Sequence, residues 1–280
     1  RTTSSAASDV YKRQDQDQTT IITASRLDVS SDDNFDAVAD QTVSVTTTDD
    51  DVAGFTIAET EGSTGVDESG STDIFTVVLT GRPITDVAFS ISSSDSTETS
   101  VTSSLTFTSE NWNTPQNVTV TGLDDDIIDG TQTSTITVSI IDGISDNAFD
   151  AVADQTVSVT TTDDDVAGFT IAETDGSTSV TEAGSTDLFT VVLNAQPTTD
   201  VVLSISSADT GEATVTSSLT FTSANWDTAQ TVTVTGVDDD LIDGTISSSI
   251  TVAVNDGSSD DNFDAVADQT VSVTTTDDDV

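Results

Sequence analysis

The feature that most constrains this chain is an internal repeat with a period of 114 residues. Trp112 recurs as Trp226, and the Asp-Asp-Asp triplet that begins at Asp49 recurs at Asp163 and Asp277. Residues 52–165 and 166–279 align without insertion or deletion. Roughly three quarters of the aligned positions are identical, which indicates a recent tandem duplication. A unit of this length corresponds to one ordinary domain, so the sequence predicts the same domain twice.

The residues before the first full repeat fall into two parts. Residues 15–51 align with 129–165, so we expect the last two strands of a truncated preceding repeat and a poorly held hairpin. Residues 1–14 match neither repeat and carry three of the five basic residues, so we expect a non-native, disordered leader. Because the chain begins with Arg1 and contains no Met, we expect it to be an internal piece of a longer protein. The predicted domains are 1–14 (leader), 15–51 (truncated repeat), 52–165 (repeat 1) and 166–280 (repeat 2).

The composition restricts which partners are plausible. The chain has 51 acidic and 5 basic residues, a formal charge of -46, and neither His nor Cys. Nucleic acids and anionic membranes are bound through Lys and Arg, so we expect neither as a partner and no direct membrane insertion. Without His and Cys, the usual zinc sites and general bases are missing, and we expect no enzymatic activity. Carboxylate and carbonyl oxygens remain, and these are the ligands of Ca²⁺.

Apolar residues alternate with Thr and Ser in short runs, which favours strands over a disordered acidic chain. Phe75, Val77 and Leu79 lie at period two, as do Ile136 and Val138. We therefore expect an all-β fold: tandem seven-stranded antiparallel Greek-key β-sandwiches, Ig-like and arranged end to end. Trp112 and Trp226 are interpreted as plugs of the core or its rim. The predicted strands of repeat 1, labelled A to G, are 54–59, 73–79, 86–93, 100–108 with a break at 103–104 left open, 116–122, 134–141 and 154–162.

The order of the strands predicts where the acidic residues meet. If seven strands alternate in direction, the A–B, C–D and E–F connections and the end of strand G lie at one pole of the sandwich. This expectation fails if strand D splits into two full strands. A solvated acidic rim is the alternative to a metal site, but four acidic segments at one pole favour calcium. The candidate ligands are Glu68, Asp95, Asp124, Asp125, Asp126, Asp129, Asp163, Asp164 and Asp165 in repeat 1, and Glu182, Asp209, Asp238, Asp239, Asp240, Asp243, Asp277, Asp278 and Asp279 in repeat 2.

The repeats resemble the Calx-beta domain. The resemblance is carried by VTEAG at 180–184, VTVTGVDDD at 232–240, TVSVTTTDDD at 270–279 and the join DDDVAGF at 163–169. It implies a β-sandwich that coordinates calcium at one end. By position, the family's ligands fall on Glu182, Asp209, Asp238 to Asp240 and Asp277 to Asp279. The chain departs from the family at 206–212, where an aromatic-rich segment is replaced, and only Asp243 follows the acidic run.

The loop between strands F and G lies at the opposite pole and carries its own carboxylates. We hypothesise that Asp260, Asp261 and Asp264 lend an oxygen to an ion at the junction with the preceding repeat. A solvated loop anchored by Phe263 is the alternative. The two readings differ in whether these carboxylates stay available to a cation.

These patterns predict a calcium-binding structural repeat. We expect a calcium-rigidified spacer of a large extracellular or cell-surface, adhesin-like protein, whose partners are calcium ions and neighbouring repeats of the same chain. Two other readings stay open: a calcium-sensing regulatory domain pair, and a carbohydrate-binding surface module. A sensor needs tighter calcium sites, and a carbohydrate module needs more aromatic surface than one Trp per repeat.

Overall fold

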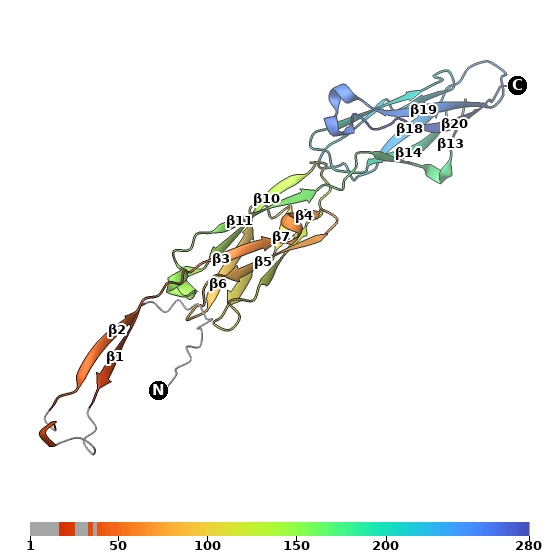
Figure 1. Cartoon of the computed structure of the whole chain (residues 1–280). Helices are drawn as coiled ribbons and strands as arrows, with labels where there is room; N and C mark the ends of the chain where they lie inside the picture. The colour runs from red at the N-terminus through yellow and green to blue at the C-terminus, as the bar shows by residue number, and fades with distance from the viewer. Residues whose placement is uncertain (1–16, 26–32, 36–37, 280) are drawn as a thin grey trace. The chain divides into compact units, whose positions relative to one another are not determined.

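The structure is a computed structural model that describes residues 17–25, 33–35 and 38–279. Within these residues the chain forms β-strands joined by loops and short 3-10 turns, as expected for an all-β protein (Figure 1). Two compact units are present: the chain up to Leu123 with Gln132–Thr162, and Asp124–Thr131 with the chain from Asp163 onward. The predicted leader, 1–14, lies outside the described residues. No helix in the described part has the length and hydropathy needed to cross a membrane.

The first unit contains a sandwich of two sheets. The four-stranded sheet has the order β3 (Phe55–Glu59), β5 (Thr72–Leu79), β9 (Gln116–Gly122) and β7 (Thr99–Val101). The five-stranded sheet has the order β4 (Thr64–Asp67), β11 (Gln155–Thr162), β10 (Gln132–Ile140), β6 (Val87–Ser93) and β8 (Ser104–Phe107).

The second unit repeats this arrangement with the same strand order. Its four-stranded sheet contains β12 (Phe169–Glu173), β14 (Thr186–Leu193), β18 (Gln230–Gly236) and β16 (Ala213–Val215). Its five-stranded sheet contains β13 (Thr178–Thr181), β20 (Gln269–Thr276), β19 (Ile246–Val254), β15 (Val201–Ser207) and β17 (Ser218–Phe221).

The first predicted strand of each repeat is divided between the two sheets, which the sequence did not indicate. In the second unit β12 ends at Glu173, and the chain kinks at Asp175, where φ is 58°. It then continues as β13, which pairs with β20 in parallel. The sandwich is therefore antiparallel except at this pair and its counterpart β4–β11, where the prediction of a wholly antiparallel fold was wrong.

The predicted fourth strand is also divided, into β16 and β17 of opposite sheets. Only Thr216 and Ser217 separate the two segments. Thr216 N–H bonds to the Thr233 carbonyl and so extends the β16–β18 ladder, while the Ser217 carbonyl accepts from Ile205 N–H and extends β15–β17. The backbone thus changes sheet without turning back. The alternation of connections between the two poles is preserved.

The core follows the period-two pattern of the strands. In the second unit Phe189, Leu203, Phe221, Ile250 and Phe263 are completely buried, while the Thr and Ser residues between core positions face outward. Trp226 and Trp112 are partly buried against the two cores, which confirms their interpretation as plugs. Apolar side chains stacked between two sheets supply most of the favourable free energy of such a domain.

The residues before repeat 1 form the predicted hairpin. β1 (Gln18–Ala24) and β2 (Gln41–Thr47) pair in antiparallel register as a separate two-stranded sheet. Every residue of both strands is exposed, and Ile21 retains 66% of its surface. Two strands alone bury too little apolar surface to be stable, in agreement with the expectation of a poorly held hairpin.

Candidate metal centre

Four segments of the second unit bring carboxylates together at one pole. Glu182 follows β13, Glu212 precedes β16, Asp239 and Asp243 lie between β18 and β19, and Asp279 follows β20. Carboxylate oxygens of Glu182, Asp239 and Asp279 lie within 4.8 Å of one another. The same holds for oxygens of Glu182, Glu212 and Asp243. The two groups share Glu182.

Backbone contacts fix Glu182 at the centre of this pole. Its N–H donates to the carbonyl of Thr276 at 3.1 Å, at the end of β20. On the other side β18 passes very close, because a Cβ on Gly236 would lie 2.0 Å from the Thr181 carbonyl oxygen. Only glycine permits this approach. The Asp run after β18 is thereby held beside the residue that precedes Glu182.

Two aspartates shape the surrounding loops. Asp277 accepts the Asp279 N–H at 2.8 Å with one oxygen and the Gly244 N–H at 2.7 Å with the other. Asp239 accepts the Leu241 N–H at 2.7 Å. Asp277 therefore ties the end of β20 to the β18–β19 loop. Both side chains act first as loop supports.

Other carboxylate oxygens at this pole are buried without a hydrogen-bond donor. Glu182 is 1% exposed, and neither of its carboxylate oxygens has a hydrogen-bond partner of normal geometry among the described residues. One oxygen each of Glu212 and Asp279 is in the same situation. A buried carboxylate without a partner is costly, since desolvation penalises its charged form.

The electrostatics reflect this crowding. Burial raises the pKa of Glu182, the Asp278 backbone N–H opposes the rise, and the negative charges of Asp277 and Asp239 add to it. Burial also raises the pKa of Glu212, followed by the charge of Asp243. The pKa of Asp279 is raised in the same way, by burial and then by Asp277. Like charges at short range repel unless a cation lies between them.

The structure places Glu212 in the group, a residue that the sequence reasoning missed. The predicted residue from this connection, Asp209, is exposed and accepts the Gly211 N–H at 3.1 Å, closing its own turn. Glu212 is only 7% exposed. A signal was available in the sequence, because a glutamate stands at both 98 and 212, whereas the residues between it and the Asp differ between the repeats.

The remaining predicted residues of repeat 2 lie at the same loops but outside the two groups. Asp238, Asp240 and Asp278 are exposed, and Asp277 is half-buried in its loop-supporting role. Their charges still act on the centre, since Asp240, Asp278 and Asp238 all raise the pKa of Asp279.

The corresponding residues of repeat 1 are divided between the two units and are described separately. In the first unit Glu68 is 1% exposed, and its N–H donates to the Thr162 carbonyl at 3.1 Å, as in repeat 2. Asp95 is exposed and accepts from both the N–H and the hydroxyl of Thr97, which lowers its pKa.

In the second unit the acidic residues of repeat 1 repeat the pattern seen after β18 and β20. Asp163 accepts from the N–H groups of Gly130 and Asp165. Burial and the charges of the neighbouring aspartates, Asp163 first, raise the pKa of Asp165 to about 6. One Asp165 oxygen is buried without a donor among the described residues. Asp125 is half-buried and accepts the Ile127 N–H, while Asp124, Asp126, Asp129 and Asp164 are exposed.

In the loop between β19 and β20, one of the three carboxylates of the junctional-ion hypothesis, that of Asp260, accepts hydrogen bonds from its surroundings. One oxygen of Asp260 accepts from the N–H and hydroxyl of Thr198 and the N–H of Thr199, and the other accepts from Asn262 N–H. Burial acts to raise the pKa of Asp260, but these hydrogen bonds outweigh it and lower the pKa. Asp260 is thus engaged in holding its own loop. The Phe263 anchor is fully buried, as the alternative reading expected.

Comparisons with known proteins give structural likenesses only. No family model matches the sequence, and no curated protein matches it. The chain is similar to the solved structure of CBD12 from CALX1.2, with 17% identity, 70% of this chain and 79% of that chain covered, and a TM-score of 0.30. The apo-form Calx CBD1 domain is 18% identical, with 41% of this chain and 100% of that chain covered and a TM-score of 0.31. Domains 4 and 5 of the S-layer protein SbsC are 20% identical, with 67% of this chain and 76% of that chain covered and a TM-score of 0.32.

Proposed function

We propose that each repeat binds Ca²⁺ at its acidic pole, and that the chain is a calcium-rigidified spacer of a large extracellular or cell-surface protein. The repeats are then of the Calx-beta type, as the sequence motifs imply. Calcium ions and neighbouring repeats are the partners, and the proposed role is structural rather than enzymatic. An adhesin-like protein is the class that such a spacer suits.

The observation that carries the proposal is the buried Glu182 carboxylate, whose oxygens have no hydrogen-bond partner of normal geometry among the described residues. Asp239, Asp279, Glu212 and Asp243 direct further oxygens to within 4.8 Å of it. A divalent cation compensates such a group of charges, since buried charges are otherwise paired or neutralised. The proposal thus accounts for an arrangement that is unfavourable without an ion.

The donor set fits calcium better than other common metals. Ca²⁺ takes six to eight oxygen ligands in flexible geometry, whereas zinc and copper sites use the His and Cys that this chain lacks. Glu182, Asp239 and Asp279 would hold one ion. Glu182, Glu212 and Asp243 would hold a second, with Glu182 shared between them.

The spacer role follows from the arrangement of the sequence. Near-identical repeats succeed each other without a linker, and their 51 acidic residues repel one another unless cations are bound. Extracellular calcium is millimolar, which saturates even weak sites of extracellular modules. Such an array becomes stiff where calcium is abundant and loosens where it is removed.

Thermal unfolding of the full chain with and without calcium tests the proposal. A ligand that binds only the folded state raises the midpoint, by about 2.7 kcal/mol of stability per site at one hundred times its Kd. We expect millimolar calcium to raise the midpoint and Glu182→Gln to remove most of the rise for the second unit. Asp227→Asn is the matched control, because it removes one exposed charge between β17 and β18, away from the centre.

An unchanged midpoint in millimolar calcium would overturn the proposal. The acidic residues would then be a solvated surface of the kind found in halophilic proteins. A calcium titration of the same chain separates a spacer from a sensor, since weak sites suit the first and sites tuned to cytosolic calcium the second.

A further inference from the structure

One loop of repeat 1 belongs, in the structure, to the second compact unit. Residues 124–131 connect β9 to β10 of the first sandwich, yet they group with the chain from Asp163 onward. At the tip of this loop lie two consecutive apolar residues, Ile127 and Ile128. Both are half-buried.

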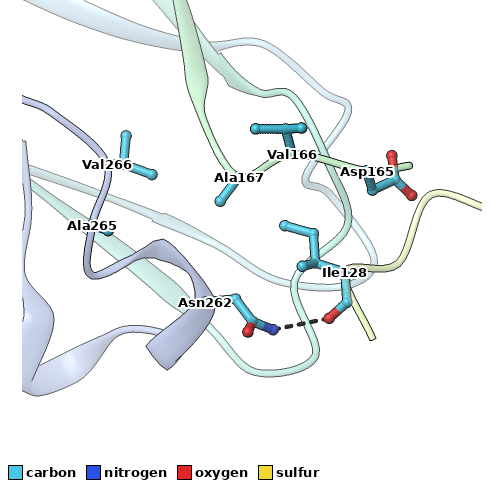
Figure 2. A pocket seen from close by; sticks show the side chains of 7 residues that line it. All are labelled: Ile128, Asp165, Val166, Ala167, Asn262, Ala265 and Val266. Atoms are coloured by element: carbon cyan, nitrogen blue, oxygen red, sulfur yellow. Dashed lines mark hydrogen bonds between the residues drawn. The ribbon is translucent and has the colours of Figure 1, made fainter. Parts of the chain in front are cut away.

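The contacts of this tip are specific. Ile128 packs against the hydrophobic core cluster of the second unit, and its carbonyl accepts from the Asn262 side chain at 2.9 Å (Figure 2). Ile127 pairs with Gln196 as an isolated β-bridge, and the Gln196 N–H donates to the Asp126 carbonyl at 2.6 Å.

The surface that receives the tip carries apolar side chains beside Asp165 and Asn262. Ile128 lines a pocket of about 350 Å³ together with Val166, Ala167, Ala265 and Val266 (Figure 2). Val166 and Ala167 precede β12, whereas Ala265 and Val266 follow the buried Phe263. Two separate segments of one domain thus form the receiving surface.

Repeat 2 carries an equivalent tip, which is exposed within the described residues. The residues equivalent to Ile127 and Ile128 are Leu241 and Ile242, which retain 62% and 72% of their surface. The loop has the same local structure, since Asp239 caps Leu241 N–H as Asp125 caps Ile127 N–H, both at 2.7 Å. The local structure of the tip is therefore the same in both repeats, and its burial differs.

We propose that Leu241 and Ile242 form a docking tip whose partner is another copy of this repeat. The occupant is identified by the second unit itself, which holds the equivalent tip of repeat 1 on its own surface. The partner repeat offers the pocket formed by the counterparts of Val166, Ala167, Ala265 and Val266. A side chain able to donate a hydrogen bond stands at the position of Asn262.

Repeat 1 differs at this last position, which gives the docking a preference. The counterpart of Asn262 in repeat 1 is Ala148, which cannot donate to the tip carbonyl, whereas the Gln196 contact is made by the backbone. A repeat with Asn at this position is therefore the better partner. Repeat 2 itself has that residue, so a further copy of 166–279 is the appropriate occupant for a test.

This inference does not rest on the proposed calcium binding. The contacts of the tip with the receiving surface are apolar packing and hydrogen bonds to the carbonyls of Ile128 and Asp126, and none of them passes through a carboxylate. If calcium leaves the unfolding midpoint unchanged, docking can still be observed in metal-free buffer. If docking fails, the calcium-dependent midpoint shift is still expected.

The test compares two chains and two matched double substitutions. One chain consists of residues 1–280, and the other consists of the same residues followed after Val280 by a copy of residues 167–279, which continues the register. Ile127→Ser/Ile128→Ser alters the tip that is already docked. Leu241→Ser/Ile242→Ser alters the exposed tip, and Ile144→Ser is the control for an exposed aliphatic residue elsewhere.

In calorimetry of the original chain, we expect Ile127→Ser/Ile128→Ser to lower the unfolding midpoint by about 4 °C. Leu241→Ser/Ile242→Ser should leave that midpoint unchanged. In the lengthened chain both double substitutions should lower the unfolding midpoint. Small-angle scattering should detect a broader distribution of molecular dimensions for Leu241→Ser/Ile242→Ser in that chain. Ile144→Ser should be neutral in both chains. If Leu241→Ser/Ile242→Ser leaves unfolding and scattering of the lengthened chain unchanged, the docking tip is disproved.

Discussion

At the acidic pole of the second unit, individual carboxylates divide into two kinds. Asp277 accepts backbone N–H groups with both of its oxygens and holds loops in place, whereas Asp239 uses one oxygen in this way. The Glu182 carboxylate and one oxygen of Asp279 are buried without a hydrogen-bond partner of normal geometry in the described chain. The first kind holds the loops of the pole, and the second kind is the one whose charge the proposed cation would compensate. Chemically identical side chains thus have different roles because of what their neighbours donate.

Glu212 and Asp209 offer a direct comparison of these two kinds. We predict that Glu212→Gln weakens calcium affinity at least tenfold, since it removes a buried ligand charge, whereas Asp209→Asn changes it less than threefold because the exposed side chain only closes a turn. Isothermal titration of both variants is the measurement. Equal losses for the two substitutions would return Asp209 to the ligand set.

The raised pKa values predict an unusual dependence of stability on pH in metal-free buffer. A carboxyl group with a folded pKa above its unfolded value stabilises the fold at low pH, and that contribution is lost as the pH rises through the folded value. For Asp165 this window runs from its ordinary 3.8 to about 6. We expect the metal-free midpoint to fall between pH 4 and pH 6.

Two further measurements make this pH prediction discriminating. In calcium the trend should reverse, because the ion binds only deprotonated carboxylates and stability then increases with pH. Below pH 4 the lowered pKa of Asp260 acts in the opposite sense, since its contribution is lost as the pH falls through the folded value. A metal-free midpoint that increases from pH 4 to pH 6 would contradict the prediction.

At the scale of the strands, the division of strands A and D between the sheets determines where the pole forms. β13 crosses to the five-stranded sheet and pairs with β20, which brings Glu182 beside the end of the terminal strand. β16 stays with the four-stranded sheet and pairs with β18, which brings Glu212 beside the acidic run, where its carbonyl accepts from Val237 N–H. The division of strands A and D therefore brings the candidate ligands Glu182 and Glu212 to the same pole.

Gly236 is the element-scale position on which this arrangement depends. We predict that Gly236→Ala lowers the stability of the second unit by about 1–3 kcal/mol, because the new Cβ would overlap the Thr181 carbonyl and force the strands apart. Calcium affinity should fall with it, as Glu182 follows Thr181. Calorimetry and calcium titration are the measurements.

Gly257→Ala is the matched control for this prediction. Gly257 has no positive φ, and the nearest atom to a Cβ there is Asn255 Oδ1 at 3.9 Å. Alanine should be tolerated, and the calcium affinity should be unchanged. Tolerance of alanine at both positions would mean that the close approach at Gly236 is not required.

At the scale of the whole molecule, charge dominates. The formal charge of -46 on 280 residues opposes compaction in metal-free buffer, and no comparable basic surface offsets it. We predict that raising NaCl from 0.1 to 1 M increases the metal-free unfolding midpoint, since the screening length falls from about 10 to about 3 Å. In calcium the increase should be smaller, because bound ions have already neutralised the closest carboxylates.

The control for this prediction is the choice of cation. Sodium and potassium chloride at equal ionic strength should act alike if screening is the cause, whereas a difference between them would indicate a specific site. A metal-free midpoint that does not respond to salt would contradict the role assigned to repulsion. Thermal unfolding monitored by circular dichroism is sufficient for the comparison.

The sequence by itself determined the features that depend on local pattern. The 114-residue period predicts the repeat, and period-two alternation predicts strands such as 116–122, whose limits coincide with those of β9. Alternating strand direction predicts that Glu182, Asp239 and Asp279 lie at one pole, and their carboxylate oxygens are within 4.8 Å of one another. The period of the apolar residues and the turns between strands depend on residues that are close in the sequence, so they can be predicted from the sequence.

Only the tertiary structure decided which carboxylate turns inward and which loop joins which unit. Asp209 and Glu212 are three residues apart and both acidic, but Asp209 is exposed and closes its own turn, whereas Glu212 is buried beside Glu182. Ile128 and Asn262 are 134 residues apart, so no local pattern predicts their contact. Side-chain direction and long-range packing depend on the folded surroundings, which is why the docking tip became visible only once the chain was folded.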